Sequence, residues 1–230
     1  MNNANLEHAT LRIIEGASWK HQRVIVLVPA AKMLATKVAF SWWSLIFPPN
    51  QAVHRIPLLG MEVGHAYSAG IDAILAHPEL RKWEFILTLE HDNIPPPDGL
   101  LKLLKRMEAH PEMHCIGGLY WTKGPNGVPQ IWGDTKDPQQ NYRPQPPKAG
   151  ELVECCGTGM GFNLWRTSMF RDLADNKDFQ KPYFETRAGV DGYGTQDLVF
   201  WGKARPLGFR CAIDCDVLVG HHDAASDHTW

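Results

Sequence analysis

Two kinds of hydrophobic pattern alternate along the first half of the chain. Continuous apolar runs rich in β-branched residues are typical of buried strands, and they lie at residues 23–30, 54–60, 83–92 and 114–121. Apolar residues that recur every three or four positions are typical of helices, and such stretches lie at residues 36–47, at residues 61–78 and after Asp98, which can cap the helix that follows. Pro57 in the second run indicates an irregular or edge position for that strand. This alternation predicts an α/β fold with a mostly parallel central sheet and helices on both faces.

The second half of the chain has a different pattern. Residues 133–151 are rich in proline, glutamine and charged side chains, which predicts a long loop. The expected strands are residues 152–166, with a glycine-rich middle, and 209–223, and the expected helices are residues 167–175 and 195–208. The last strand runs into His221 and His222. No repeat or linker divides the chain, so we expect a single domain over residues 1–230.

Composition narrows the classes of function. Apolar residues make up 44% and charged residues 21% of the 230 residues, which is ordinary for a globular protein, and a net charge of -2 predicts no broad contact with nucleic acid or an anionic membrane. No apolar run reaches the roughly 20 residues of a membrane span, and the polar N-terminus does not resemble a signal peptide. We therefore expect a cytoplasmic protein, in the host cytoplasm if its source is viral. The five cysteines include an adjacent pair, which predicts reduced, buried thiols rather than a disulfide framework.

The predicted strand at residues 83–92 ends in a polar group of Glu90, His91 and Asp92. Ligands of mostly parallel sheets bind beyond the carboxyl ends of the strands, where this group lies. Glu90 and Asp92 are two residues apart, so they point to the same side of an extended chain, where two carboxylates repel unless a cation or a proton intervenes. Mg2+ and Mn2+ use few protein carboxylates and complete their shells with substrate phosphates. The strand end therefore predicts a metal–diphosphate site, whereas a helix cap or pairing with a lysine is the simpler explanation for a lone aspartate.

Two further groups could belong to the same site. His221 or His222 could supply an imidazole ligand, which Mn2+ accepts beside carboxylates. Asp197 lies at the start of a predicted helix, where it could be a general base at the rim of the site or only an acid favoured by the helix dipole. The sequence contains no phosphate-binding P-loop, no dinucleotide glycine motif after the first strand and no nucleophile elbow.

The motifs follow one another in an order that is more specific than any one of them. A first strand ends near Pro29, and an acid-x-acid strand end precedes "PPPDGLLKLL"; then come "GTGMGFNLWRTSMF", "PYF", "GTQDLVFWGKARPLGF" and "VGHH". Over roughly residues 23–222, this order resembles the GT-A type glycosyltransferases, especially family 2-like enzymes and their phage-encoded relatives. The resemblance implies one GT-A, Rossmann-like domain. Its nucleotide-sugar-binding half would be residues 23–120, its acceptor and catalytic half residues 121–222, and its flexible tail residues 223–230.

The resemblance also implies roles for the matching polar residues. Glu90, His91 and Asp92 stand at the Asp-x-Asp motif of the family. Asp92 would bind the metal on the nucleoside diphosphate, and Glu90 would help through the ribose or a metal-bound water. His221 matches a histidine that some such enzymes use as a further metal ligand, with His222 as the competing choice.

Other matches concern the donor pocket and the chemistry. Asp197 matches the aspartate of a Glu-Asp pair that acts as catalytic base in inverting members, although Gln196 stands where the family has the Glu. Pro29 and Ala30 would line the base or ribose pocket. The "GTGMG" segment, with Gly159 at its centre, would lie beside the sugar and the acceptor.

Together these matches imply a metal-dependent glycosyltransferase. It would use Mn2+ or Mg2+ and a nucleoside-diphosphate sugar, with UDP-sugar as the family default, and would invert the anomeric centre with Asp197 as base. The acceptor hydroxyl could belong to a glycan, a protein, a small molecule or a modified DNA base. Two alternatives stay open: a metal-dependent phosphoesterase or nucleotidyltransferase that uses the same acidic strand end, and a non-catalytic sugar-nucleotide binder. The second is favoured by Gln196 and by Glu90, which replaces the first Asp of the family motif.

Overall fold

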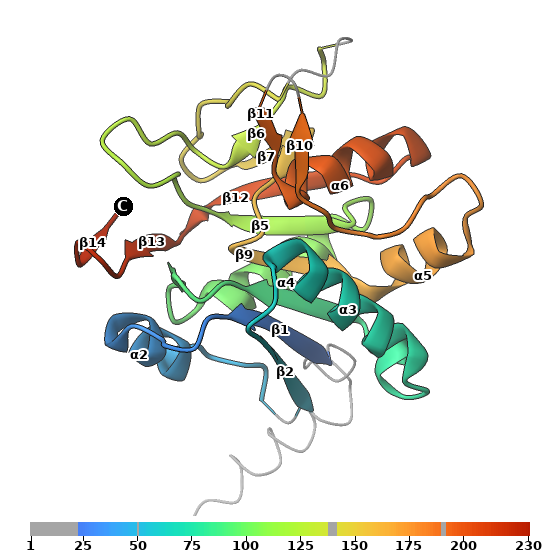
Figure 1. The fold of residues 1–230 in the computed structure, drawn as a ribbon, viewed down its shortest axis with the longest axis horizontal. Helices are drawn as coiled ribbons and strands as arrows, with labels where there is room; N and C mark the ends of the chain where they lie inside the picture. Colours follow the sequence, from blue (N-terminus) through green and yellow to red (C-terminus); the bar gives the residue numbers. More distant parts are fainter. Residues whose placement is uncertain (1–22, 50, 138–141, 190–191) are drawn as a thin grey trace, which may run out of the picture.

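The computed structural model describes residues 23–49, 51–137, 142–189 and 192–230, which form one layered α/β unit (Figure 1). The strands of its main sheet are β1 (Val24–Ala30), β2 (Val53–Leu59), β3 (Phe85–Leu89), β5 (Cys115–Leu119), β7 (Leu152–Cys155), β9 (Phe162–Arg166) and β12 (Cys211–Leu218). They are ordered β2-β1-β3-β9-β5-β12-β7. Five strands run in one direction, and β9 and β7 are antiparallel to their neighbours. The predicted α/β class and mostly parallel sheet are confirmed, and β2, which contains Pro57, is an edge strand as predicted.

Helices cover both faces of the sheet (Figure 1). They are α2 (Thr36–Ser44), α3 (Val63–Ala76), α4 (Gly99–Ala109), α5 (Thr167–Asp175) and α6 (Gln196–Ala204), with short 3-10 turns η1 (Leu80–Lys82) and η2 (Arg205–Leu207). Alternate residues of a strand point to opposite faces, so β1 contributes Ile25 and Leu27 to the core under α3, α5 and α6, and Val24 and Val26 to the core under α4. Within the described residues, no helix is both long enough and apolar enough to cross a membrane.

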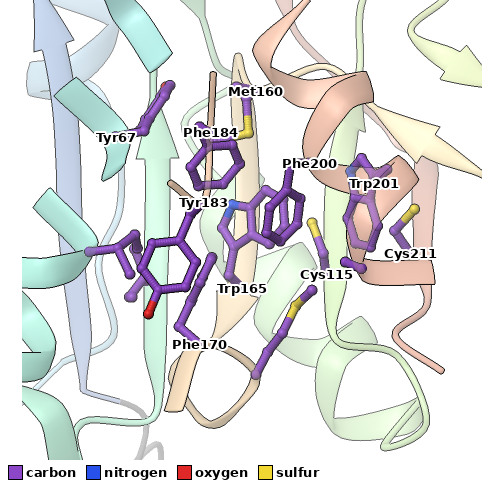
Figure 2. Close-up of a cluster of buried hydrophobic side chains, with 14 of the residues drawn as sticks. Tyr67, Cys115, Met160, Trp165, Phe170, Tyr183, Phe184, Phe200, Trp201 and Cys211 are labelled. Carbon is purple, nitrogen blue, oxygen red and sulfur yellow. The ribbon is translucent and has the colours of Figure 1, made fainter. Parts of the chain in front are cut away.

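An aromatic cluster around Trp165 of β9 forms the centre of the larger core (Figure 2). Its ring stacks on Trp201 with the centroids 5.4 Å apart, and the rings of Phe170 and Phe200 lie 5.6 Å away. The indole N–H donates a hydrogen bond to the hydroxyl of Thr88 on β3, at 3.1 Å. Because these rings join α5 and α6 to the middle of the sheet, they fix the position of the first turn of α6 at the carboxyl edge.

Three smaller groups of strands complete the fold. They are β4 (Asn93–Ile94) with β13 (Gly220–Asp223) and β14 (His228–Thr229), β6 (Ile131–Trp132) with β8 (Gly157–Thr158), and β10 (Arg187–Gly189) with β11 (Gly192–Gly194). Residues 223–230, predicted as a flexible tail, form the turn and return strand of the β13–β14 hairpin. Two backbone hydrogen bonds between His221 and Trp230 close it, at 2.9 and 3.1 Å.

The prediction of one strand over residues 152–166 is wrong. The structure has three short strands there, β7, β8 and β9, and they belong to different positions in the fold. The break falls at the glycine-rich middle, where a Cβ on Gly159 would lie 2.2 Å from the Tyr120 hydroxyl and one on Gly161 would lie 2.6 Å from the Asn93 amide. The pieces on both sides are buried or half-buried, so the apolar run itself carries no signal of the break.

Two smaller differences concern element ends. The expected last strand at residues 209–223 is divided into β12 and β13, which lie in different sheets. Asp98 occupies the N-cap position of α4, but its carboxylate pairs with Lys102 at 3.0 Å and caps no backbone N–H.

All five cysteines are buried and free, as predicted.

Candidate active site

A pocket of about 540 Å³ lies at the carboxyl edge of the sheet. The ends of β1, β2 and β3 meet there because parallel strands end at the same edge. The lining residues are Pro29, Ala30, Ala31, Lys32, Gly60, Met61, Val63, Glu90, His91, Asp92 and Gln196. The pocket thus brings together the predicted residues from β1 and from the acidic strand end. Gly159, Asp197 and His221 do not line it.

The Asp92 carboxylate contacts two basic side chains. Its Oδ2 lies 2.6 Å from the Lys123 Nζ and 3.4 Å from the His221 Nε2. His221 reaches this position because β13 pairs with β4, which places His221 opposite Asn93. The backbone N–H of His222 also donates to the Asp92 carbonyl, at 2.7 Å. The antiparallel pairing of β13 with β4 therefore positions His221, the second predicted metal ligand, at the end of the site.

The orientation of the His221 ring is set by a backbone carbonyl. Its Nδ1 lies 2.7 Å from the Trp121 carbonyl oxygen, which can only accept, so Nδ1 carries the proton of that bond. The other ring nitrogen, Nε2, faces the Asp92 carboxylate, and these two atoms attract only when a proton or a cation lies between them. His222 is directed elsewhere: its Nδ1 lies 3.1 Å from the Thr229 hydroxyl. The structure places His221, not His222, beside Asp92.

The two carboxyls of the strand end have opposite pKa shifts. Burial raises the pKa of Glu90 to about 8, and the charges of Asp92 and Asp197 add to the rise. Burial also acts to raise the pKa of Asp92, but its contacts with His221 and Lys123 outweigh burial and hold that pKa well below its usual range. At neutral pH and without a bound cation, Glu90 is therefore protonated and Asp92 is ionised.

Asp197 lies in the first turn of α6, beneath the rim of the pocket rather than on it. The residue is only 7% exposed, and the adjacent Gln196 lines the pocket instead. The Asp197 Oδ1 accepts a hydrogen bond from the backbone N–H of Leu198 at 2.9 Å. Burial raises the pKa of Asp197, against hydrogen bonds from Thr195 and Leu198 that lower it.

The "GTGMG" segment lies behind the acidic strand end. The carbonyl of Gly161 accepts the backbone N–H of Glu90 at 3.0 Å, and the N–H of Gly161 donates to the Tyr120 hydroxyl at 2.9 Å. Gly159 is enclosed by Tyr120 and Gln130, which occupy the space of a Cβ. The segment therefore supports Glu90 through the backbone.

Asp92 and His221 have the geometry of two neighbouring ligands of one divalent cation. Adjacent ligands of an octahedral ion with bonds of about 2.1 Å lie about 3 Å apart, close to the 3.4 Å that separates Oδ2 from Nε2. Metal-bound histidines usually donate their other N–H to a carbonyl or a carboxylate, as His221 does. Among the described residues no group of three or more His, Cys, Asp or Glu side chains could surround an ion. Diphosphate oxygens and water would have to complete the shell, as is usual for Mg2+.

Lys123 is a contact of Asp92 that the sequence analysis did not identify. It follows β5 by a few residues, at the same edge of the sheet as the acidic strand end, so the rule that ligands bind at carboxyl ends of strands could have identified it. The Trp121 carbonyl was also missed, because no side-chain pattern reports a backbone acceptor.

Comparison with known proteins supports the fold. No protein-family model and no curated protein sequence matches the chain. The structure is similar to that of A197 from STIV, with a TM-score of 0.60 and 14% identity over 87% of this chain and 86% of that one. It is also similar to GalNAc-T7, solved with UDP, GalNAc and Mn2+, with a TM-score of 0.57 and 12% identity over 88% of this chain and 44% of that one. The chain therefore has a GT-A type fold.

Proposed function

We propose that the protein is a divalent-cation-dependent glycosyltransferase that moves a sugar from a nucleoside-diphosphate sugar to an acceptor hydroxyl. The GT-A type fold supports this proposal at the level of architecture, and GalNAc-T7, which shares it, was solved with UDP and Mn2+. The observation that carries the proposal is the Asp92–His221 pair, with its 3.4 Å separation and its carbonyl-oriented imidazole. The adjoining pocket, at about 540 Å³, lies within the range of small-molecule sites.

The donor site would be divided between a metal end and a nucleoside end. Asp92 and His221 would hold Mn2+ or Mg2+, which when bound stabilises negative charge on the diphosphate as the sugar departs. The protonated carboxyl of Glu90 can donate a hydrogen bond to a ribose hydroxyl, as an ionised carboxylate could not. Pro29 and Ala30, at the end of β1, would contact the base or the ribose.

Asp197 would act as the general base. The acceptor hydroxyl would give its proton to Asp197 while its oxygen attacks the anomeric carbon, and the sugar–phosphate bond would break with its electron pair passing to the diphosphate. A pKa raised by burial brings a carboxylate closer to the working pH, which favours proton transfer. Attack from the side opposite the diphosphate inverts the configuration. The acceptor would have to enter past Gln196, which lines the pocket, whereas Gly159 does not.

The two alternative functions predict different results. A two-metal phosphoesterase needs several carboxylates around its ions, and the described residues offer no group of three. A non-catalytic binder would hold the donor but not turn it over.

We propose UDP-sugars as the first donors to test; the acceptor classes are a glycan, a protein, a small molecule or a modified DNA base.

Calorimetric titration tests the donor site directly. UDP, GDP and TDP are titrated into the protein with Mn2+ and with EDTA, and again into Asp92→Asn and His221→Gln. Asp98→Asn, which removes a carboxylate from the start of α4, is the matched control. We expect one nucleotide to bind with Mn2+ only, and affinity to fall by about 10- to 100-fold in the two site variants and not in the control. Failure of all three nucleotides to bind, or equal binding by Asp92→Asn, would overturn the proposal.

A second step separates the enzyme from the binder. Hydrolysis of the matching nucleotide sugar, with and without mixed acceptors, is followed for the wild type and for Asp197→Asn. We expect Asp197→Asn to keep nucleotide binding and to lose transfer by about 100-fold or more. Nucleotide binding without any turnover by the wild type would identify a binder instead.

A further inference from the structure

Asp92 is already neutralised by a positive charge of the protein itself. The Lys123 ammonium lies 2.6 Å from Asp92 Oδ2, the same oxygen that faces His221 Nε2. The side chains of Lys123 and Asp92 are 34% and 23% exposed, so the pair is partly shielded and still reached by solvent. A carboxylate that is placed to bind a divalent cation is thus occupied by a lysine.

The backbone around Lys123 holds it in this place. The loop that leaves β5 is closed by a bridge between Trp121 and Pro129. Above this bridge, Thr122 makes two hydrogen bonds with Val128: its N–H donates to the Val128 carbonyl, and its hydroxyl accepts the Val128 N–H, both at 2.9 Å. Lys123 is the next residue, so its Cα is fixed while its long side chain remains free to change direction. The backbone therefore aims the lysine at the metal-binding end of the site.

A divalent cation and the Lys123 ammonium compete for the same carboxylate oxygen. A cation between Asp92 and His221 would take the Oδ2 lone pairs that Lys123 now uses, and two positive charges at that distance repel each other. We propose that Lys123 is a displaceable counter-ion, which neutralises Asp92 in the empty site, yields this place to the divalent cation, and then binds the diphosphate of the donor. This inference rests on the proposed function, since it assumes that a metal–diphosphate binds here.

After its displacement from Asp92, the lysine is needed to balance the charge of the bound donor. A nucleoside-diphosphate sugar carries two negative charges and Asp92 carries one, so a divalent cation leaves one negative charge unpaired. Lys123 supplies the missing positive charge. When the sugar leaves, the diphosphate gains a further negative charge, which the lysine also stabilises. Lys32, which follows β1, is the lysine that lines the pocket, whereas Lys123 contacts Asp92 from the loop after β5.

The test is whether removing the Lys123 charge changes the affinity for the metal and the affinity for the nucleotide in opposite directions. Lys123→Met keeps most of the length of the side chain without its charge, and Lys123→Arg keeps the charge. Lys105→Met removes a lysine from the exposed side of α4 as the matched control. Binding of Mn2+ alone is measured from the paramagnetic resonance signal of free Mn2+. Binding of UDP, or of the nucleotide selected above, is measured by calorimetry at saturating Mn2+. Thermal unfolding checks that each variant is folded.

We expect Lys123→Met to bind Mn2+ about 5- to 10-fold more tightly than the wild type and the nucleotide about 5- to 10-fold more weakly. Lys123→Arg and Lys105→Met should remain close to the wild type in both titrations. Unchanged or weaker Mn2+ binding by Lys123→Met would overturn the proposal, and unchanged nucleotide binding would overturn its second half.

The results also separate this proposal from the proposed function. If wild-type binding of Mn2+ and nucleotide depends on Asp92 while Lys123→Met behaves like the wild type, only the role of Lys123 fails. If no nucleotide binds the wild type in the presence of Mn2+, both proposals fail, because there is then no metal–diphosphate site at which the lysine could act.

Discussion

The protonated carboxyl of Glu90 makes the stability of the protein depend on pH in a direction that Glu90→Gln should reveal. Burial and the charges of Asp92 and Asp197 raise the pKa of Glu90 from 4.5 to about 8, whereas the Tyr67 hydrogen bond and the Lys123 charge act to lower it. Between these two pH values the folded state binds more protons at this site than the unfolded state. The contribution of Glu90 to stability is therefore fully present below about pH 4.5 and is lost as pH rises through about 8.

The size of the effect follows from the two pKa values. Between about pH 6 and pH 8 this site alone would lower the free energy of unfolding by at most about 2 kcal/mol. One side of the carboxyl faces the open pocket, where water screens its charge, so we expect about half of this value, about 1 kcal/mol. For a domain of this size that corresponds to a shift in Tm of about 2–4 °C.

Thermal unfolding in EDTA, at a series of pH values from about 5 to about 9, measures the effect. Glutamine resembles the protonated carboxyl and cannot ionise, so the Tm of Glu90→Gln relative to the wild type should rise with pH and level off above about 8. Glu108→Gln, on an exposed position of α4, controls for the loss of one carboxyl. A Tm difference that stays constant, or shrinks with rising pH, would refute the reasoning by showing that Glu90 is ionised in the folded protein.

Two further predictions concern the scaffold behind the site. Arg106→Met should lower stability by about 3 kcal/mol, because it leaves Asp214, whose side chain is 1% exposed, without its bidentate partner at 3.0 and 3.3 Å; an unchanged Tm would show that another group or water replaces the guanidinium. Gly117→Ala should cost about 2 kcal/mol, because the new Cβ would lie 2.1 Å from the Asn163 amide oxygen between β5 and β9. Gly202→Ala, where the nearest atom would be 3.6 Å away, is its control and should gain up to about 1 kcal/mol in a helix; equal Tm changes in the two glycine variants would contradict the packing explanation.

The sequence by itself determined the architecture and one half of the candidate site. The alternation of strand and helix patterns is a local property of each segment, and it predicted the sheet, its helices and the edge position of β2. The position of Glu90 and Asp92 could also be predicted, because a strand that stops at these residues brings both to the carboxyl edge wherever the strand lies in the sheet. Pro29 and Ala30 join them for the same reason, as β1 is parallel to β3.

The other half of the site depends on contacts between distant segments. His221 lies beside Asp92, and His222 does not, because β13 pairs with β4 in one register; a shift by one residue would exchange them. Asp197 lies below the rim rather than on it, because the aromatic core around Trp165 holds α6 close to the sheet. Lys123 meets Asp92 through a loop whose shape depends on its own backbone hydrogen bonds. Periodicity reports which residues are buried, but strand register, helix depth and loop shape follow from packing and hydrogen bonding between segments, which only the tertiary structure decides.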